Sequence, residues 1–194
     1  MVLLHGVGSN ADNMMPVARA LAPMLPDADV LVPDGLDPWS GGPGAREWYS
    51  LQNITDAERS ARVEPAGRAL SAWLDEELAS RSLDGSKLIV VGFSQGAGLA
   101  EWLVVRRPTA PVAIALSGRF YVDGDNKAAA GARALVVHGT DDRVVPLSYG
   151  EASRKGLEAR GVEVQWVSLP GLGHHIDDRV IAAVRDYLMT VTSK

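Results

Sequence analysis

The sequence predicts an α/β protein with a mostly parallel central sheet of about six strands and helices on both faces. Short apolar runs such as Leu88–Val91, Pro111–Leu116 and Ala134–Val137 alternate along the chain with longer stretches of helical periodicity. Runs of continuous apolarity are typical of strands that are covered on both faces, as in parallel α/β sheets. Polar and glycine-rich segments follow these runs, and the carboxyl ends of the strands are where such sheets bind ligands.

Each element is predicted from apolar spacing and from glycine and proline breakers. In the first half we expect strands at 2–4 and 29–33, helices at about 11–25 and 63–79, and a glycine-rich loop at 36–50. In the second half we expect strands at 88–91, 111–116, 134–137 and 162–169, and helices at about 97–105, 147–160 and 177–189. Nothing in the composition marks a linker or a repeat, so residues 1–194 are predicted to form one domain.

Composition restricts the classes of function. The chain has a net charge of −5 and its basic residues are scattered, which argues against nucleic acid as a partner. It contains no cysteine, so disulfides and thiolate chemistry are excluded. Its histidines and carboxylates show no metal-ligand spacing, so no metal and no cofactor is predicted. No signal-peptide core or membrane-length apolar run is seen, and we expect a cytoplasmic protein, with a homodimer left open.

The segment Gly92-Phe93-Ser94-Gln95-Gly96 lies between the apolar run 88–91 and a helix-like stretch. This layout is typical of a nucleophile elbow, in which a strand turns sharply into a helix and exposes a serine. The turn forces the serine into a strained backbone conformation and leaves no room for side chains two residues away, hence the glycines. The alternative is a small-residue loop in which Ser94 only caps the helix. The apolar run before this segment and the helix-like stretch after it favour Ser94 as a nucleophile.

A serine hydroxyl is a poor nucleophile unless an adjacent base accepts its proton. Of the four histidines, His5 and His138 each precede a glycine directly after a strand, where we expect them to brace the turn. His174 and His175 lie in the loop after the last strand, and either is a candidate base.

The third group should be a carboxylate that orients the base. Asp141 and Asp142 follow the strand at 134–137, and either is a candidate acid. One of them can instead form a turn or cap before Val144. The order serine, aspartate, histidine along the chain is that of the α/β-hydrolases.

Four motifs together resemble the small carboxylesterase family of the α/β-hydrolases, the phospholipase/carboxylesterase group that also contains the acyl-protein thioesterases. The motifs are His5-Gly6-Val7-Gly8, Gly92–Gly96, His138-Gly139-Thr140-Asp141-Asp142 with Val145-Pro146, and Gly171-Leu172-Gly173-His174. The similarity covers essentially the whole chain. It implies an α/β-hydrolase fold in which Asp142 is the acid and His174 the base. It also implies that the backbone N–H groups of Val7 and Gln95 form the oxyanion hole.

The chain departs from the family pattern at two places. Arg143 stands where many members have a proline after the catalytic aspartate, which bears on loop shape. The usual fold also begins with two further strands, and this chain starts within what would be the third. We therefore expect either a short form of the fold or a truncated reading frame, with residues 29–33 at the edge of the sheet.

The predicted activity is hydrolysis of short-to-medium-chain carboxylic esters through an acyl-enzyme. No insertion long enough for a large lid follows the strand at 111–116, so we expect an open site that takes a small-molecule ester. Candidate walls of its pocket are the aromatic residues of two loops, Trp39, Trp48, Tyr49, Phe120 and Tyr121. The aromatic residues of the glycine-rich loop at 36–50 can instead pack back onto the core, and this alternative is left open. An acyl-protein thioesterase or lysophospholipase could use the same triad. A non-catalytic binding protein of this fold is the remote alternative.

Overall fold

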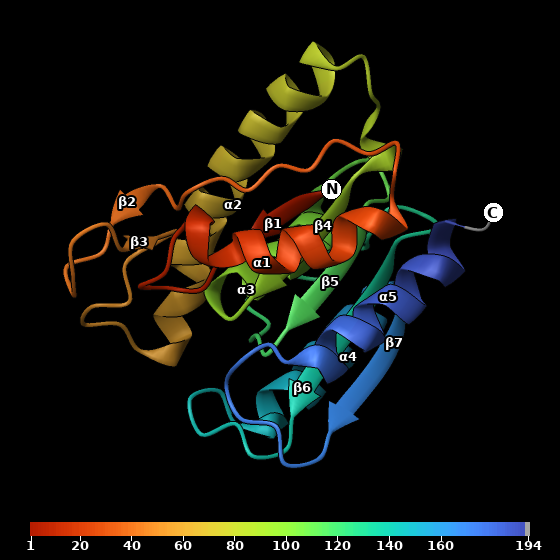
Figure 1. Cartoon of the computed structure of the whole chain (residues 1–194). Coiled ribbons are helices and arrows are strands. Elements are labelled where there is room, and N and C mark those ends of the chain that lie inside the picture. Colours follow the sequence, from red (N-terminus) through yellow and green to blue (C-terminus); the bar gives the residue numbers. More distant parts are fainter. Residues whose placement is uncertain (193–194) are drawn as a thin grey trace.

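Five parallel strands form the central sheet of the computed structural model, which describes residues 1–192 apart from the side chains of residues 56 and 57 (Figure 1). The strands lie in the order β1-β4-β5-β6-β7. Their bounds are Val2–Leu4, Ile89–Phe93, Val112–Leu116, Arg133–Gly139 and Glu163–Leu169. Because all five run in one direction, their carboxyl ends lie along one edge of the sheet, and the loops that follow them are neighbours.

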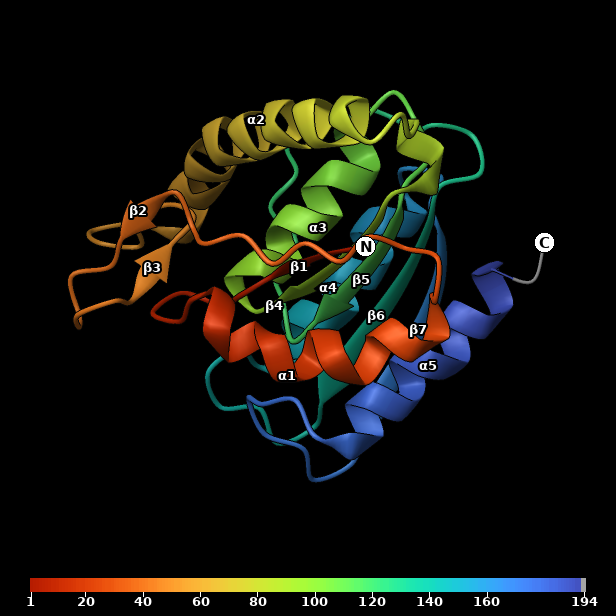
Figure 2. The same ribbon diagram turned by 45° about the horizontal axis from the view of Figure 1, so that its top comes forward.

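Helices cover both faces of this sheet (Figure 2). On one face lie α1 (Ala11–Leu21) and α5 (Asp178–Thr192), and on the other lie α2 (Asp56–Ser80), α3 (Gln95–Arg106) and α4 (Leu147–Glu158). Two short 3₁₀ segments, η1 (Ala22–Met24) and η2 (Gly85–Lys87), end α1 and precede β4. Within residues 1–192, no helix is both long and apolar enough to cross a membrane.

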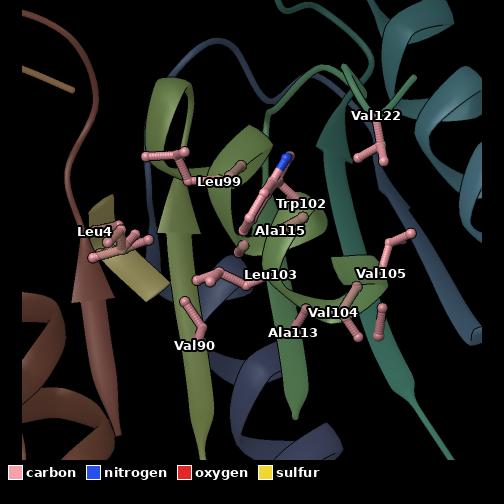
Figure 3. Close-up of a cluster of buried hydrophobic side chains, with 14 of the residues drawn as sticks. Leu4, Val90, Leu99, Trp102, Leu103, Val104, Val105, Ala113, Ala115 and Val122 are labelled. Carbon is pink, nitrogen blue, oxygen red and sulfur yellow. The ribbon is translucent and has the colours of Figure 1, made fainter. Parts of the chain in front are cut away.

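The core is divided by the sheet into two layers, because successive side chains of a strand point to opposite faces. In β1, Leu4 packs on the face covered by α3, whereas Leu3 packs on the face covered by α1 and α5. Figure 3 shows the first layer, in which side chains of α3 such as Leu103 lie over Val90 of β4 and Ala113 of β5. The small side chains of β5 on this face leave room for the larger ones of α3.

The α1 helix illustrates how local sequence produces an element. The Asn10 side chain accepts a hydrogen bond from the backbone N–H of Asn13 (3.2 Å), which caps the helix. Met14, Val17 and Leu21 recur at helical spacing and are buried against the sheet. The apolar spacing extends to residue 25, but the chain tightens into η1 after Leu21, so the α-helix is shorter than predicted.

Residues 29–33 differ from the prediction, because they do not form a regular strand. Leu31 alone bridges to Val2, with hydrogen bonds from Leu3 N to Leu31 O and from Leu31 N to Met1 O, both 2.9 Å. Pro33 has no N–H to extend the pairing. The sheet therefore has five strands rather than six, although this segment does lie along its edge as expected. The α2 helix also begins seven residues before its predicted start, over a polar stretch that carries no apolar period.

The loop at 36–50 contains a small antiparallel hairpin of β2 (Asp37–Pro38) and β3 (Arg46–Glu47). Arg46 also pairs with the loop after β1, since Arg46 N donates to Ser9 O (2.7 Å) and Gly8 N donates to Arg46 O (2.9 Å). The hairpin is thus attached to the carboxyl edge of the sheet.

Candidate active site

The turn between β4 and α3 places Ser94 at the carboxyl edge of the sheet. Its backbone has a φ of 53° and a ψ of −111°, a strained conformation for a residue with a side chain. A Cβ on Gly92 would lie 2.1 Å from Gly96 O, and one on Gly96 would lie 2.4 Å from Leu4 O. Both glycines are therefore required by space, as the motif predicts.

Three side chains from different loops meet at this turn. The Nε2 atom of His174 lies 3.0 Å from Ser94 Oγ, and its Nδ1 atom lies 2.7 Å from Asp142 Oδ2. The carboxylate accepts from Nδ1–H, so Nε2 carries the lone pair that can accept the serine proton. The loops after β4, β6 and β7 thus bring together the serine, aspartate and histidine that the family resemblance selects.

Asp142 is held rigidly in a buried position. Its Oδ1 atom accepts hydrogen bonds from the backbone N–H groups of Val144 (2.9 Å) and Val145 (2.8 Å). Burial by itself would raise the pKa of Asp142, but the hydrogen bonds from His174 and these two N–H groups outweigh it, and the net pKa is lowered. The carboxylate therefore stays ionised while it orients His174.

The neighbouring candidates lie elsewhere. Asp141 is exposed and accepts a hydrogen bond from the Thr140 hydroxyl (2.8 Å). His175 is exposed on the wall of the adjacent cavity and makes no side-chain hydrogen bond within the described part of the chain. The ring of Phe93 packs against His174 with centroids 4.8 Å apart, which adds a second restraint on that imidazole.

The two remaining histidines are fully buried and brace turns, as the sequence suggests. His5 donates from Nδ1 to Gly6 O (2.7 Å) and accepts at Nε2 from Gly35 N (2.8 Å). Burial lowers the pKa of His5, so the ring is neutral, as this pair of bonds requires. His138 donates from Nε2 to Val145 O (2.8 Å), which supports the turn that holds Asp142.

Two backbone N–H groups follow the carboxyl ends of β1 and β4, those of Val7 and Gln95. Gln95 is the first residue of α3, so its N–H precedes the first hydrogen bond of the helix. Within residues 1–192, the N–H of Val7 has no hydrogen-bond partner, although its neighbours Gly8 and Ser9 both donate. Free N–H groups next to a nucleophile can stabilise negative charge on a substrate oxygen.

A cavity of about 480 Å³ opens beside Ser94 and His174. Its size falls within the range of small-molecule sites, roughly 300–1,000 Å³. Most of its remaining wall is apolar and comes from α1, the end of β4 and the loops, namely Val7, Met14, Pro16, Val17, Phe93, Val144 and Ile176. The residues of α1 appear in the sequence as ordinary core positions, because helical periodicity does not distinguish a core face from a pocket wall.

The five aromatic residues predicted as pocket walls do not line this cavity. Trp48 and Tyr49 are buried in the core. Trp39 packs against Gly8 in the loop after β1, and Phe120 packs against Gly156 of α4. Tyr121 packs at the margin of the core layer that contains α3. The aromatic content of a loop indicates that it is anchored, but not which surface it faces.

Comparisons with known proteins indicate the family and the fold of this chain. Residues 1–192 match the Phospholipase/Carboxylesterase family. The esterase YpfH of Escherichia coli is 31% identical over 189 residues, which cover 97% of this chain and 81% of that protein. The acyl-protein thioesterase 1 homolog 1 of Dictyostelium discoideum is 26% identical over 80% of this chain and 72% of that protein. The crystal structure of esterase PE8 superposes with a TM-score of 0.89 at 28% identity and covers 98% of this chain and 91% of that one.

Proposed function

Because the chain belongs to the phospholipase/carboxylesterase family of hydrolases, we propose that it is a serine carboxylesterase acting on short-to-medium-chain esters. The observation that carries the proposal is the continuous hydrogen-bonded line from Ser94 through His174 to Asp142. This arrangement supports nucleophilic catalysis, because His174 can accept the proton of the weakly nucleophilic Ser94 hydroxyl and Asp142 orients the imidazole of His174. The esterase relative of Escherichia coli supports ester hydrolysis as the reaction.

In the proposed mechanism, Ser94 Oγ attacks the ester carbonyl while His174 Nε2 accepts the serine proton. The imidazolium is stabilised by Asp142 and returns the proton to the alkoxide as the carbon–oxygen bond breaks. Water then attacks the acyl-enzyme, His174 accepts its proton, and that proton returns to Ser94 as the acid leaves.

The backbone N–H groups of Val7 and Gln95 are proposed to donate to the carbonyl oxygen as it becomes negative. Each such donor contributes about 2.7–4 kcal/mol to transition-state stabilisation. Their position after the carboxyl ends of the neighbouring strands β1 and β4 supports this role.

We propose that the cavity beside Ser94 receives the acyl chain. Its apolar wall, which includes Met14, Val17 and Ile176, is suited to a hydrocarbon, and each buried methylene adds about 0.8 kcal/mol. This gain ends once the limited volume is filled. A p-nitrophenyl ester series should therefore show a maximum at short-to-medium acyl length. Activity that rose steadily to palmitate would contradict the assignment.

The proposal is tested by labelling with a fluorophosphonate probe and by Ser94→Ala. The wild-type protein should react with the probe and hydrolyse p-nitrophenyl esters, and Ser94→Ala should lose labelling and reduce kcat on the order of 10⁶-fold. Ser117→Ala is the matched control, because this serine follows the next strand and also has a positive φ, of 52°. Absence of labelling in the folded wild-type protein would leave a non-catalytic binding role.

A second candidate is hydrolysis of acyl thioesters, which the Dictyostelium discoideum relative named as a thioesterase favours. The same three side chains would serve, since only the leaving group changes. Comparing kcat/KM for an ester and a thioester that carry the same acyl chain distinguishes the two candidates.

A further inference from the structure

The side chain of Gln95 forms a two-sided hydrogen-bonded contact that the mechanism above does not use. Its Oε1 accepts from the backbone N–H of Trp48 (2.9 Å), and its Nε2 donates to Tyr49 O (2.7 Å). The side chain is buried, with Gln95 only 6% exposed. A neutral amide offers an acceptor and a donor side by side, which are the two groups that the backbone of Trp48 and Tyr49 requires here.

The segment that Gln95 holds is attached to the loop after β1 at two points. Trp48 Nε1 donates to His5 O (2.9 Å), at the beginning of that loop. Arg46 exchanges hydrogen bonds with Gly8 and Ser9, at its end. Val7 lies between these two points, so its N–H is carried by a loop that the segment 46–49 fastens on both sides.

The two proposed oxyanion donors therefore belong to one hydrogen-bonded unit, although they follow different strands. From the backbone of Gln95 the path runs through its own side chain to Trp48, and from there to the loop that carries Val7. We propose that the Gln95 side chain is a positioning residue that sets the separation of the Val7 and Gln95 N–H groups. This inference rests on the proposed function of the site.

The alternative is that Gln95 serves only to fill and satisfy the core. The two roles separate experimentally, because the donor of Gln95 is its backbone N–H and survives every substitution of the side chain. A variant that disturbs only packing lowers stability, whereas misplaced donors weaken binding of the transition state more than that of the substrate. The expected signature is therefore a loss of kcat with little change in KM.

Gln95→Met is the principal variant, since methionine has similar length and can make neither hydrogen bond. We expect kcat to fall about 10- to 100-fold, because small misplacements of catalytic groups have effects of that order, while KM changes by less than about threefold. Affinity for a trifluoromethyl ketone, whose adduct with serine carries an oxyanion, should fall in parallel with kcat/KM. Gln165→Met, at an exposed position of β7, is the control for the substitution itself and should retain wild-type kcat.

Gln95→Glu adds a second measurement, the pH dependence of kcat relative to wild type, which a change in packing alone would not affect. Its carboxyl group can donate to Tyr49 O only when protonated, so the ratio of its kcat to that of wild type should decrease as pH rises. Taking the ratio at each pH removes the shared titration of the enzyme. Leu188→Ala, which destabilises a fully buried position of α5, controls for loss of stability and should retain kcat below its unfolding temperature.

The outcomes separate this inference from the function on which it rests. If wild type neither hydrolyses esters nor reacts with a fluorophosphonate, the proposed function fails. If wild type is active and Gln95→Met retains its kcat and its ketone affinity, the positioning role alone is overturned. A pH-independent ratio for Gln95→Glu would overturn it as well.

Discussion

Replacing Glu101 with glutamine should make the protein more stable at neutral pH and should remove part of the pH dependence of its unfolding. Glu101 lies on α3 and is fully buried. The hydroxyl of Ser153 on α4 interacts with it, but within the described residues none of these side-chain oxygens has a hydrogen bond of ordinary geometry. Burial raises the pKa of Glu101 from 4.5 to about 8, and the Ser153 hydroxyl offsets only part of this effect.

The direction in which stability changes with pH follows from proton linkage. A carboxyl group whose pKa is raised on folding is bound to a proton in the native state while the unfolded chain has lost it. Its contribution to stability is therefore fully present below pH 4.5 and is lost progressively as pH rises to about 8. At about 1.4 kcal/mol per pH unit, the wild-type protein loses about 3 kcal/mol between pH 5 and pH 8 from this group.

Glu101→Gln keeps the shape of the protonated acid and does not titrate. The free energy of unfolding, measured by urea titration and tryptophan fluorescence, should favour the variant increasingly from pH 5 to pH 8. Glu76→Gln, at an exposed position of α2, is the control and should track wild type at every pH. A difference between Glu101→Gln and wild type that did not change with pH would refute the reasoning.

Three other substitutions test the site and the turn that carries it. His174→Ala should reduce kcat on the order of 10⁶-fold in an ester assay, whereas His175→Ala should change it little, and the reverse order would identify His175 as the base. Val17→Phe places a larger side chain on the cavity wall and should shift the acyl-length optimum toward shorter esters, so an unchanged optimum would place the acyl chain elsewhere. Gly96→Ala should lower the free energy of unfolding by at least about 1–3 kcal/mol, because its Cβ would lie 2.4 Å from a carbonyl oxygen of β1; Gly42→Ala, which meets no atom within 4 Å, should not.

Much of the fold could be predicted because its strands and helices follow from local patterns of apolar residues. The run 88–91 becomes β4 and the turn after it becomes a strained serine between two glycines, since these outcomes depend on neighbouring residues. The segment 29–33 was wrongly predicted as a strand, because pairing requires a partner along its whole length and only Leu31 has one. A run of apolar residues does not reveal how many of them pair with a neighbouring strand.

The residues of the candidate site could likewise be predicted only in part. The family resemblance selected Asp142 over Asp141 and His174 over His175, and the structure brings these two side chains and Ser94 within hydrogen-bonding distance. Trp48 and Tyr49 were predicted as pocket walls, but they lie in the core, where their backbone groups bond to Gln95. The spacing of Trp48, Tyr49 and Gln95 in the sequence does not indicate that they form hydrogen bonds, because more than forty residues separate Gln95 from the other two.

The sequence by itself therefore indicated the α/β class and, through its resemblance to a known family, the family and the three candidate catalytic side chains, because these depend on apolar runs and on the short motifs that follow them. Only the tertiary structure decided which surface becomes the cavity and how the loops around it are fastened. Met14 and Val17 line the cavity because α1 lies beside the elbow, and the Gln95 side chain connects two loops because the hairpin folds against both. Such contacts arise from the packing of distant elements, which no local pattern encodes.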